Sequence, residues 1–347
     1  MSPSIVTAYW FSIIVKGKEL RFITLLLLTI LLPYFLTAND DRPPVPYDFL
    51  AKKEVRSFVD MMVKKHHFTR SYMTAVLESA KLDRDTLARY TGKYKVGTTN
   101  GPWERYKAHV LDPITLDKAK QFKKRYYKTL LKASREYQVD MDYIVGFIGV
   151  ESKYGEYSGD YNVLDALSTL AFHKNRMKKF FKSELEHLFL MAREQSYDIT
   201  ALKGSFAGAM GMVQQMPSVF RKYGMDYNRD GKKDPWDLED AIGIIAKFMQ
   251  KNGWKKNALV AVPTKFKGKR YTKLKTSHRR TLPLETILKY GITPLKRFNE
   301  SKAYLLKNRN LTHDDIWLGA KNFRVLTRYN NSTSYGMAIH LIAQAVK

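Results

Sequence analysis

Residues 144–155 read IVGFIGVESKYG, an apolar run that ends in a single acid. Ile144, Ile148 and Glu151 share one face of a helix, because steps of three and four residues return to the same side. Apolar neighbours disfavour the ionised form of a carboxyl group and raise its pKa. Glu151 is therefore a candidate general acid that keeps its proton near neutral pH. The alternative is a glutamate at a helix end whose carboxylate points to water.

Composition indicates a globular protein with an anionic partner. The 347 residues include 44% hydrophobic side chains, and 60 Lys+Arg against 33 Asp+Glu give a net charge of +27. Such an excess predicts nucleic acid, a membrane surface or an acidic polymer such as cell-wall glycan as partner, although scattered charge also fits a solvated surface. Cysteine is absent, which excludes disulfides, a thiol nucleophile and cysteine-ligated metal.

The N-terminus has the pattern of an export signal. Apolar runs at residues 5–15 and 22–36 flank Lys16, Lys18 and Arg21. A basic patch followed by about fifteen apolar residues is typical of a secretory signal. The second run is short for a spanning helix and contains Pro33. Residues 1–38 are thus predicted to be a signal peptide or an uncleaved anchor in the inner membrane, and the pattern leaves both open.

The body of the chain is predicted to be mainly helical, because apolar residues recur at helical intervals. We expect a proline-rich linker at 42–46, two short amphipathic helices near Phe58 and Val76, and one helix over 116–137. Further helices are expected at 165–171, 177–192, 237–249 and 335–346. Residues 255–320 are polar and basic, and KFKGKRYTKLKT (265–276) predicts a small hairpin within a minor subdomain.

Residues 226–237, DYNRDGKKDPWD, have the spacing of a calcium-binding loop. The predicted ligands are the side chains of Asp226, Asn228, Asp230 and Asp237, the carbonyl of Lys232, and Asp234 through water. Asp occupies the twelfth position where Glu is usual, and two lysines oppose high affinity. The site would be structural and take no part in catalysis; the alternative is an ordinary Asp/Asn/Gly turn.

Other chemistries lack their motifs. The eight histidines form no HExxH spacing, and neither GxxxxGK[ST] nor GxSxG is present. GSFAGAMG (204–211) contains three glycines in eight residues, which predicts a tight turn where the backbone approaches another group closely.

Six ordered blocks resemble the B-type membrane-bound lytic transglycosylases of bacteria, which cleave peptidoglycan. The blocks are GVESKYG (149–155), VLDALSTLAF (163–172), SELEHLFLMARE (183–194), LKGSFAGAMG (202–211), DPWDLEDAIG (234–243) and NFRVLTRYNNSTSYGMAI (322–339). The resemblance implies a predominantly α (α+β) fold: a lysozyme-like helical core with an added helical domain and a small β-containing subdomain. The expected boundaries are 39–138 for the N-terminal linker and helical domain, 139–254 for the core, 255–320 for the subdomain and 321–347 for a segment that completes the core.

The resemblance also implies the reaction. These enzymes cut the β-1,4 bond between N-acetylmuramic acid and N-acetylglucosamine, and the muramyl C6 hydroxyl closes a 1,6-anhydro ring. Glu151 aligns with the acid/base, which first protonates the leaving oxygen and then accepts the C6 proton. Ordinary glycosidases need two carboxylates, so a lone glutamate suits this chemistry.

Further residues are carried over by the matching motifs as substrate contacts: Ser205, Gln214, Tyr329, Asn330, Tyr335, Arg176 and, more weakly, Tyr106. Tyrosines suit sugar binding because their faces stack on sugar rings while the hydroxyl forms hydrogen bonds. Met177 replaces the second of two arginines usual in the family, and Met212, Val213 and Gln215 around Gln214 also depart from its pattern.

The resemblance implies peptidoglycan strands as partner, no catalytic cofactor, a monomer, no nucleic acid, and a location in the periplasm or cell envelope of a Gram-negative bacterium. The missing cysteine excludes lipid attachment. A muramidase that hydrolyses with water and a non-catalytic peptidoglycan-binding scaffold are the competing hypotheses. A basic nucleic-acid-binding protein is a third, which the export signal opposes.

Overall fold

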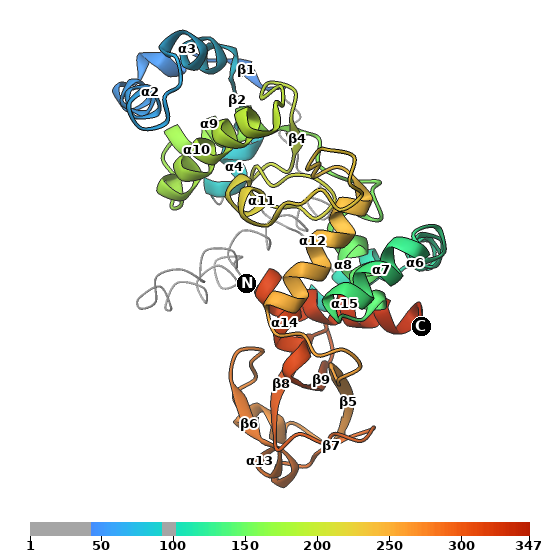
Figure 1. Cartoon of the computed structure of the whole chain (residues 1–347). Coiled ribbons are helices and arrows are strands. Elements are labelled where there is room, and N and C mark those ends of the chain that lie inside the picture. The colour runs from blue at the N-terminus through green and yellow to red at the C-terminus, as the bar shows by residue number, and fades with distance from the viewer. Residues whose placement is uncertain (1–42, 92–101) are drawn as a thin grey trace. The chain divides into compact units, whose positions relative to one another are not determined.

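The computed structural model describes residues 43–91 and 102–347 (Figure 1). The predicted signal or anchor over residues 1–38 lies outside these ranges. Within them, no helix combines the length and apolarity needed to cross a bilayer. The described chain forms two compact units, one from residues 43–91 and 157–240 and the other from 102–156 and 241–347.

The first unit is mainly helical. Its elements are β1 (Val45–Pro46), η4 (Phe49–Ala51), α2 (Lys53–His66), α3 (Arg70–Ser79), β2 (Lys81–Leu82), α4 (Arg84–Thr91), β3 (Tyr161–Asn162), α9 (Val163–Phe172), α10 (Lys178–Gln195), β4 (Lys203–Gly204) and α11 (Pro217–Tyr223). The predicted amphipathic pair is confirmed as α2 and α3, with Phe58 and Val76 buried. Thr69 begins α3 by accepting the Tyr72 amide, as a threonine N-cap does.

The second unit combines helices with a sheet. Its helices are α5 (Pro102–Val110), α6 (Pro113–Arg125), α7 (Tyr127–Tyr137), α8 (Met141–Ser152), α14 (Lys321–Tyr329), α15 (Thr333–Ala345) and most of α12 (Leu238–Lys251). Helices α8 and α15 pack closely against each other. A Cβ added at Gly146 would lie 2.7 Å from the Ile339 carbonyl oxygen, so only glycine allows the two helices to approach this far.

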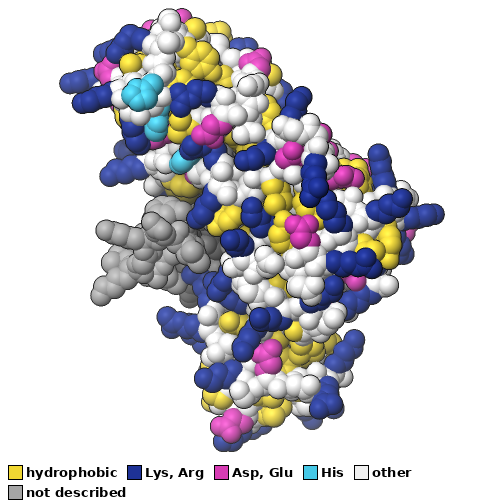
Figure 2. Space-filling model, viewed as in Figure 1, with side chains coloured by type: hydrophobic (Ala, Val, Ile, Leu, Met, Phe, Trp, Pro, Cys, Tyr) yellow, Lys and Arg dark blue, Asp and Glu magenta, His cyan; other side chains and the backbone are white. Residues whose placement is uncertain are grey.

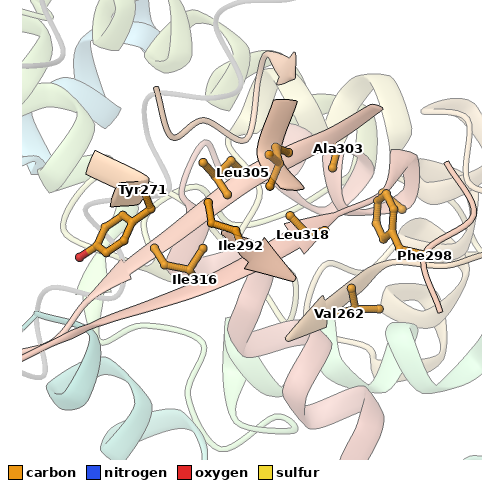
Figure 3. Packing of buried hydrophobic residues seen from close by; sticks show 10 residues of the cluster. Val262, Tyr271, Ile292, Phe298, Ala303, Leu305, Ile316 and Leu318 are labelled. Atoms are coloured by element: carbon orange, nitrogen blue, oxygen red, sulfur yellow. The ribbon is translucent and has the colours of Figure 1, made fainter. Parts of the chain in front are cut away.

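The β-subdomain is a five-stranded antiparallel sheet in the order β6-β8-β9-β5-β7. Its elements are β5 (Ala261–Phe266), η5 (Arg270–Lys273), β6 (Thr281–Pro283), α13 (Leu284–Lys289), β7 (Ile292–Pro294), β8 (Lys302–Arg309) and β9 (Asp314–Gly319). Alternate residues, among them Leu305, Ile316 and Leu318, form a core of their own on one face of the sheet (Figure 3). The opposite face carries Asn308 and Trp317 and contacts α5 and α15.

Two local predictions are wrong. Residues 116–137 form two helices, α6 and α7, because Tyr126 leaves helical geometry with φ −100° and ψ 20°. Residues 265–276 form no hairpin. The chain turns at Gly268 and enters η5, where Tyr271 is buried and donates its hydroxyl to Asp314, so β5 pairs with the distant strands β7 and β9 instead. The predominantly helical α+β class is as predicted.

Candidate active site

Glu151 lies in the last turn of α8 with 3% of its surface exposed, so the alternative of a solvated helix-end carboxylate is wrong. The helix ends immediately afterwards, where Lys153, Tyr154 and Gly155 have successive positive φ angles of 48°, 64° and 94°. Non-glycine residues rarely adopt this region, and such strain is concentrated at functional sites. The motif ESKYG therefore stops α8 one residue beyond the buried acid.

Tyr335 is the hydrogen-bond partner of Glu151. Its hydroxyl donates to Glu151 Oε1 over 2.5 Å, between α15 and α8. The first turn of α15 is fixed by Ser332, whose hydroxyl accepts the Tyr335 amide at 3.3 Å. The glycine crossing at Gly146 and Ile339 lies one helical turn away from this pair and brings the two helices close enough for the bond.

Burial raises the pKa of Glu151 from 4.5 to about 8, and the hydrogen bond from Tyr335 opposes that rise. Burial also raises the pKa of Tyr106 and of Tyr335 well above its usual range, and the negative charge of Glu151 acts in the same direction. Glu151 thus holds a proton at neutral pH while both phenols stay neutral, which is the state a general acid needs.

Two candidate substrate contacts of the second unit each carry a buried polar atom with no hydrogen-bond partner among the described residues. These atoms are Tyr106 Oη and Asn330 Oδ1. Buried polar atoms are nearly always paired in native proteins, so an orphaned one calls for an explanation. Tyr329 precedes Asn330 and packs edge-on against Phe147 and Phe248, with ring centroids 5.4 and 4.8 Å away. Tyr106, Tyr329, Asn330, Tyr335 and Glu151 all belong to the second unit.

Ser205, Gln214 and Arg176 belong to the first unit. Ser205 accepts the amides of Ala207 and Ala209 at 3.3 and 3.1 Å and so holds the glycine-rich turn closed. The expected close approach is present there, since a Cβ at Gly211 would lie 2.0 Å from the Pro235 carbonyl oxygen.

Gln214 has a positive φ of 48°. Its amide nitrogen donates to the carbonyls of Ser158 and Gly211, whereas Oε1 is buried without a partner among the described residues. Arg176 is exposed in the turn between α9 and α10.

The loop of residues 226–237 is held by its own amides. Asp226 accepts the amides of Asp230 and Gly231, and Asn228 accepts that of Asp230. Asp237 accepts the amides of Glu239 and Asp240 at the start of α12. Over the described residues, no group of three or more His, Asp or Glu side chains is placed to hold a metal ion.

Asp240, which the loop spacing does not include, organises this loop. It is fully buried, and its two oxygens accept the amides of Tyr227, Asn228 and Asp234 at 2.5, 3.4 and 2.9 Å. The only sequence signal for it is its place in the block DPWDLEDAIG. The twelfth and last position of the calcium-binding pattern is Asp237. Asp240 lies three residues later, so the pattern does not include the carboxylate that shapes the loop.

Comparison with known proteins identifies the family. The family model of the transglycosylase SLT domain matches residues 50–344. Membrane-bound lytic murein transglycosylase B of Escherichia coli K12 is 37% identical over 306 residues, which cover 86% of this chain and 84% of that protein. The chain belongs to the B-type lytic murein transglycosylases. It is therefore an enzyme of the peptidoglycan-cleaving lyase class.

Solved structures agree with this assignment. The lytic transglycosylase SLT35 of Escherichia coli in complex with bulgecin A has a TM-score of 0.80 and 36% identity, covering 87% of this chain and 95% of that one. A second structure of SLT35, in complex with calcium, matches with the same TM-score, identity and coverage. The expected lysozyme-like fold of this transglycosylase is thereby confirmed.

Proposed function

We propose that Glu151 is the sole acid/base with which this transglycosylase cleaves the β-1,4 bond between N-acetylmuramic acid and N-acetylglucosamine, forming 1,6-anhydromuramic acid. The observation that carries the proposal is the buried carboxyl at the end of α8, which accepts a hydrogen bond from Tyr335. Burial raises its pKa, and the Tyr335 hydrogen bond opposes that rise.

The reaction divides into two proton transfers through one carboxyl group. In the first, Glu151 gives its proton to the glycosidic oxygen as the bond from muramyl C1 to that oxygen breaks. In the second, the resulting carboxylate accepts the proton of the C6 hydroxyl as O6 bonds to C1. The substrate's N-acetyl oxygen can stabilise the cationic intermediate, as in substrate-assisted glycosidases. Glu151 then regains its starting state.

The Tyr335 hydroxyl fits this cycle because it donates to Oε1 of the carboxyl group, over whose two oxygens the negative charge spreads once the proton leaves. A hydrogen bond to a charged acceptor is roughly twice as strong as one between neutral groups. Tyr335 would therefore stabilise the carboxylate more than the acid, and its effect would be largest between the two steps.

Most of the residues proposed to contact the sugar carry either a buried polar atom without a hydrogen-bond partner among the described residues or an aromatic ring. Tyr106 and Asn330 present buried polar atoms that need a partner, and Gln214 does so from the first unit. On the family motif we also propose Tyr329 of the second unit, and Ser205 and Arg176 of the first, as sugar contacts.

Product analysis on purified peptidoglycan tests the proposal. Mass spectrometry should find anhydromuramyl ends with the wild type, and Glu151→Gln should lose at least about 1,000-fold in rate because no proton can be delivered. Circular dichroism of the variant controls for folding. Reducing muramyl ends would instead establish a hydrolysing muramidase. Unchanged turnover by Glu151→Gln would show that Glu151 is not the acid/base.

We also propose a structural Ca²⁺ in the loop of residues 226–237. The oxygen-only set of Asp226, Asn228, Asp230 and Asp237, with the Lys232 carbonyl and Asp234, suits this hard cation. The calcium complex of SLT35 supports the idea. Binding would stiffen the loop and leave the chemistry of Glu151 unchanged. Isothermal titration with Ca²⁺, using Asp230→Asn as control, should give saturable binding with the wild type only.

The site of action is proposed to be the cell envelope, where the murein substrate lies. The export pattern of residues 1–38 and the membrane-bound relative of Escherichia coli support this placement. Fractionation of cells that express the full chain would locate it, and N-terminal sequencing of the mature protein would separate a cleaved signal from an anchor. Gel filtration tests the expected monomer.

A further inference from the structure

We propose that His278 of the β-subdomain is a positioning residue for Glu151, acting through the start of α15 and Tyr335. The inference rests on the proposed role of Glu151. It concerns the second unit alone and begins with residues 330–334, which comprise the segment between α14 and α15 and the start of α15.

His278 contacts this segment with both ring nitrogens. Nε2 lies 2.9 Å from Asn331 Oδ1, and Nδ1 lies 2.9 Å from Thr333 Oγ1. Arg279 Nε donates to the same Asn331 oxygen at 2.6 Å, which identifies that atom as the acceptor. His278 Nε2 therefore carries the hydrogen, and Nδ1 accepts from the Thr333 hydroxyl.

The histidine is itself anchored to the sheet. The Ser277 amide donates to the Leu305 carbonyl of β8 at 2.8 Å, and the Ser277 hydroxyl accepts the amides of Arg279 and Arg280. A second tie joins Ser334 to Asn308 of β8 at 3.2 Å. The β-subdomain thus grips the chain from Asn331 to Ser334, which is the first turn of α15 and the residues before it.

The grip leads directly to the acid. Tyr335 is the third residue of α15, and its hydroxyl reaches Glu151 at 2.5 Å. A hydrogen bond this short tolerates little displacement of the helix that supplies it, because its strength depends on distance and angle. Fixing Thr333 and Asn331 therefore fixes where the Tyr335 hydroxyl stands. The sheet has a catalytic consequence although it supplies no catalytic residue.

The His278 imidazole does not titrate in the pH range of an assay. Burial lowers the pKa of His278 to about 4; the hydrogen bond to Asn331 opposes this, and the charges of Arg324 on α14 and neighbouring Arg279 reinforce it. The groups that face the Glu151–Tyr335 pair are Tyr106 from α5 and Tyr329 from α14. His278 stays neutral above about pH 5, so any change in pH profile on its replacement reports on Glu151.

The test is the pKa of Glu151 in His278→Ala, measured both from the alkaline limb of kcat on glycan strands and by ¹³C NMR of labelled glutamate. Tyr335→Phe is the reference variant. We expect both variants to raise this pKa by about 0.5 or more and to lower kcat about tenfold, with KM changed less than twofold. The double variant should shift the pKa no further than Tyr335→Phe alone, because both act through one hydrogen bond.

Three controls keep the test decisive. His278→Gln can donate to Asn331 and should recover part of the rate, and Lys275→Ala, an exposed neighbour, should behave as wild type. Thr333→Val removes the hydroxyl at similar volume and serves if His278→Ala does not fold. An unchanged Glu151 pKa with wild-type kcat, or additive shifts in the double variant, would overturn the inference. Retained activity in Glu151→Gln would instead overturn the proposed function.

Discussion

Tyr335 on α15 and Glu151 on α8 stand 184 positions apart in the sequence and share a 2.5 Å hydrogen bond. The bond joins the most C-terminal block of the family motif to the stretch that ends in the acid. It gives a buried carboxyl one charge-stabilising partner while burial holds its pKa near 8. The balance between these two influences sets when the proton leaves.

Tyr335→Phe should raise the pKa of Glu151, because only the opposing effect of burial remains. The alkaline limb of the kcat profile should move to higher pH. The rate at its optimum should fall about 10- to 100-fold, which corresponds to the roughly 1.5–3 kcal/mol of a hydrogen bond to a charged group. The profile measured on purified glycan strands checks both effects. A limb that moved to lower pH would show that water replaces the tyrosine.

Glu151→Gln should stabilise the protein increasingly as pH rises. The folded pKa of about 8 lies above the unfolded value of 4.5, so the unfolded state releases its proton first and wild-type stability falls between these pH values. The variant should gain about 2 kcal/mol at pH 6 and about 4 kcal/mol at pH 8. Urea unfolding at pH 4, 6 and 8 measures this. Equal stabilisation at all three values would mean that Glu151 is not protonated in the folded state.

Gly146→Ala should separate α8 from α15, because its Cβ would stand 2.7 Å from the Ile339 carbonyl oxygen. We expect a loss of about 1–3 kcal/mol in the free energy of unfolding, as for other overpacked cores. The loss of kcat should exceed what the folded fraction explains, because Tyr335 lies on α15 and would move away from Glu151 with it. Gly253→Ala is a matched control for space, since nothing lies within 4 Å of a Cβ there, and at its φ of 86° it costs strain only.

Tyr106→Phe should stabilise the free enzyme while weakening substrate binding. The hydroxyl is buried without a partner among the described residues, and such a group costs about 1–3 kcal/mol. The expected result is a higher melting temperature with a KM raised about tenfold if the hydroxyl meets the sugar. Thermal unfolding and kinetics on the same preparation decide. A variant that loses stability would imply that the hydroxyl is satisfied by bound water.

Asp240→Asn should loosen the loop of residues 226–237. One amide oxygen cannot accept the three backbone hydrogen bonds that the carboxylate accepts, and the new NH₂ group faces amide donors. We expect a loss of about 2–3 kcal/mol and faster hydrogen exchange at the Tyr227 and Asp234 amides. Asp230→Asn, at an exposed position of the same loop, should have little effect on stability without Ca²⁺.

Much of the fold followed from local patterns. Helical periodicity located α2, α3, α9, α10, α12 and α15. Each of these helices buries apolar residues on one face, and such residues recur every three or four positions in the sequence. It failed where a tertiary contact overrides the local preference. Tyr271 is buried in the core of the sheet and donates to Asp314, which draws the predicted hairpin segment away from its own pairing. The break at Tyr126 is instead a local change of backbone angles, to φ −100° and ψ 20°, that the periodicity does not record.

The sequence by itself singled out Glu151 as the candidate acid. An apolar run into Glu151, together with ordered motif blocks, was enough to single it out and to predict its protonated state. Only the tertiary structure decided what touches it. Tyr335 hydrogen-bonds Glu151 and His278 hydrogen-bonds Asn331, in both cases between residues far apart in the chain. The unpaired buried atoms of Tyr106 and Asn330 likewise became known only from the structure. Hydrogen bonds depend on distance and direction in space, and spacing along a chain carries that information only within one helix or turn.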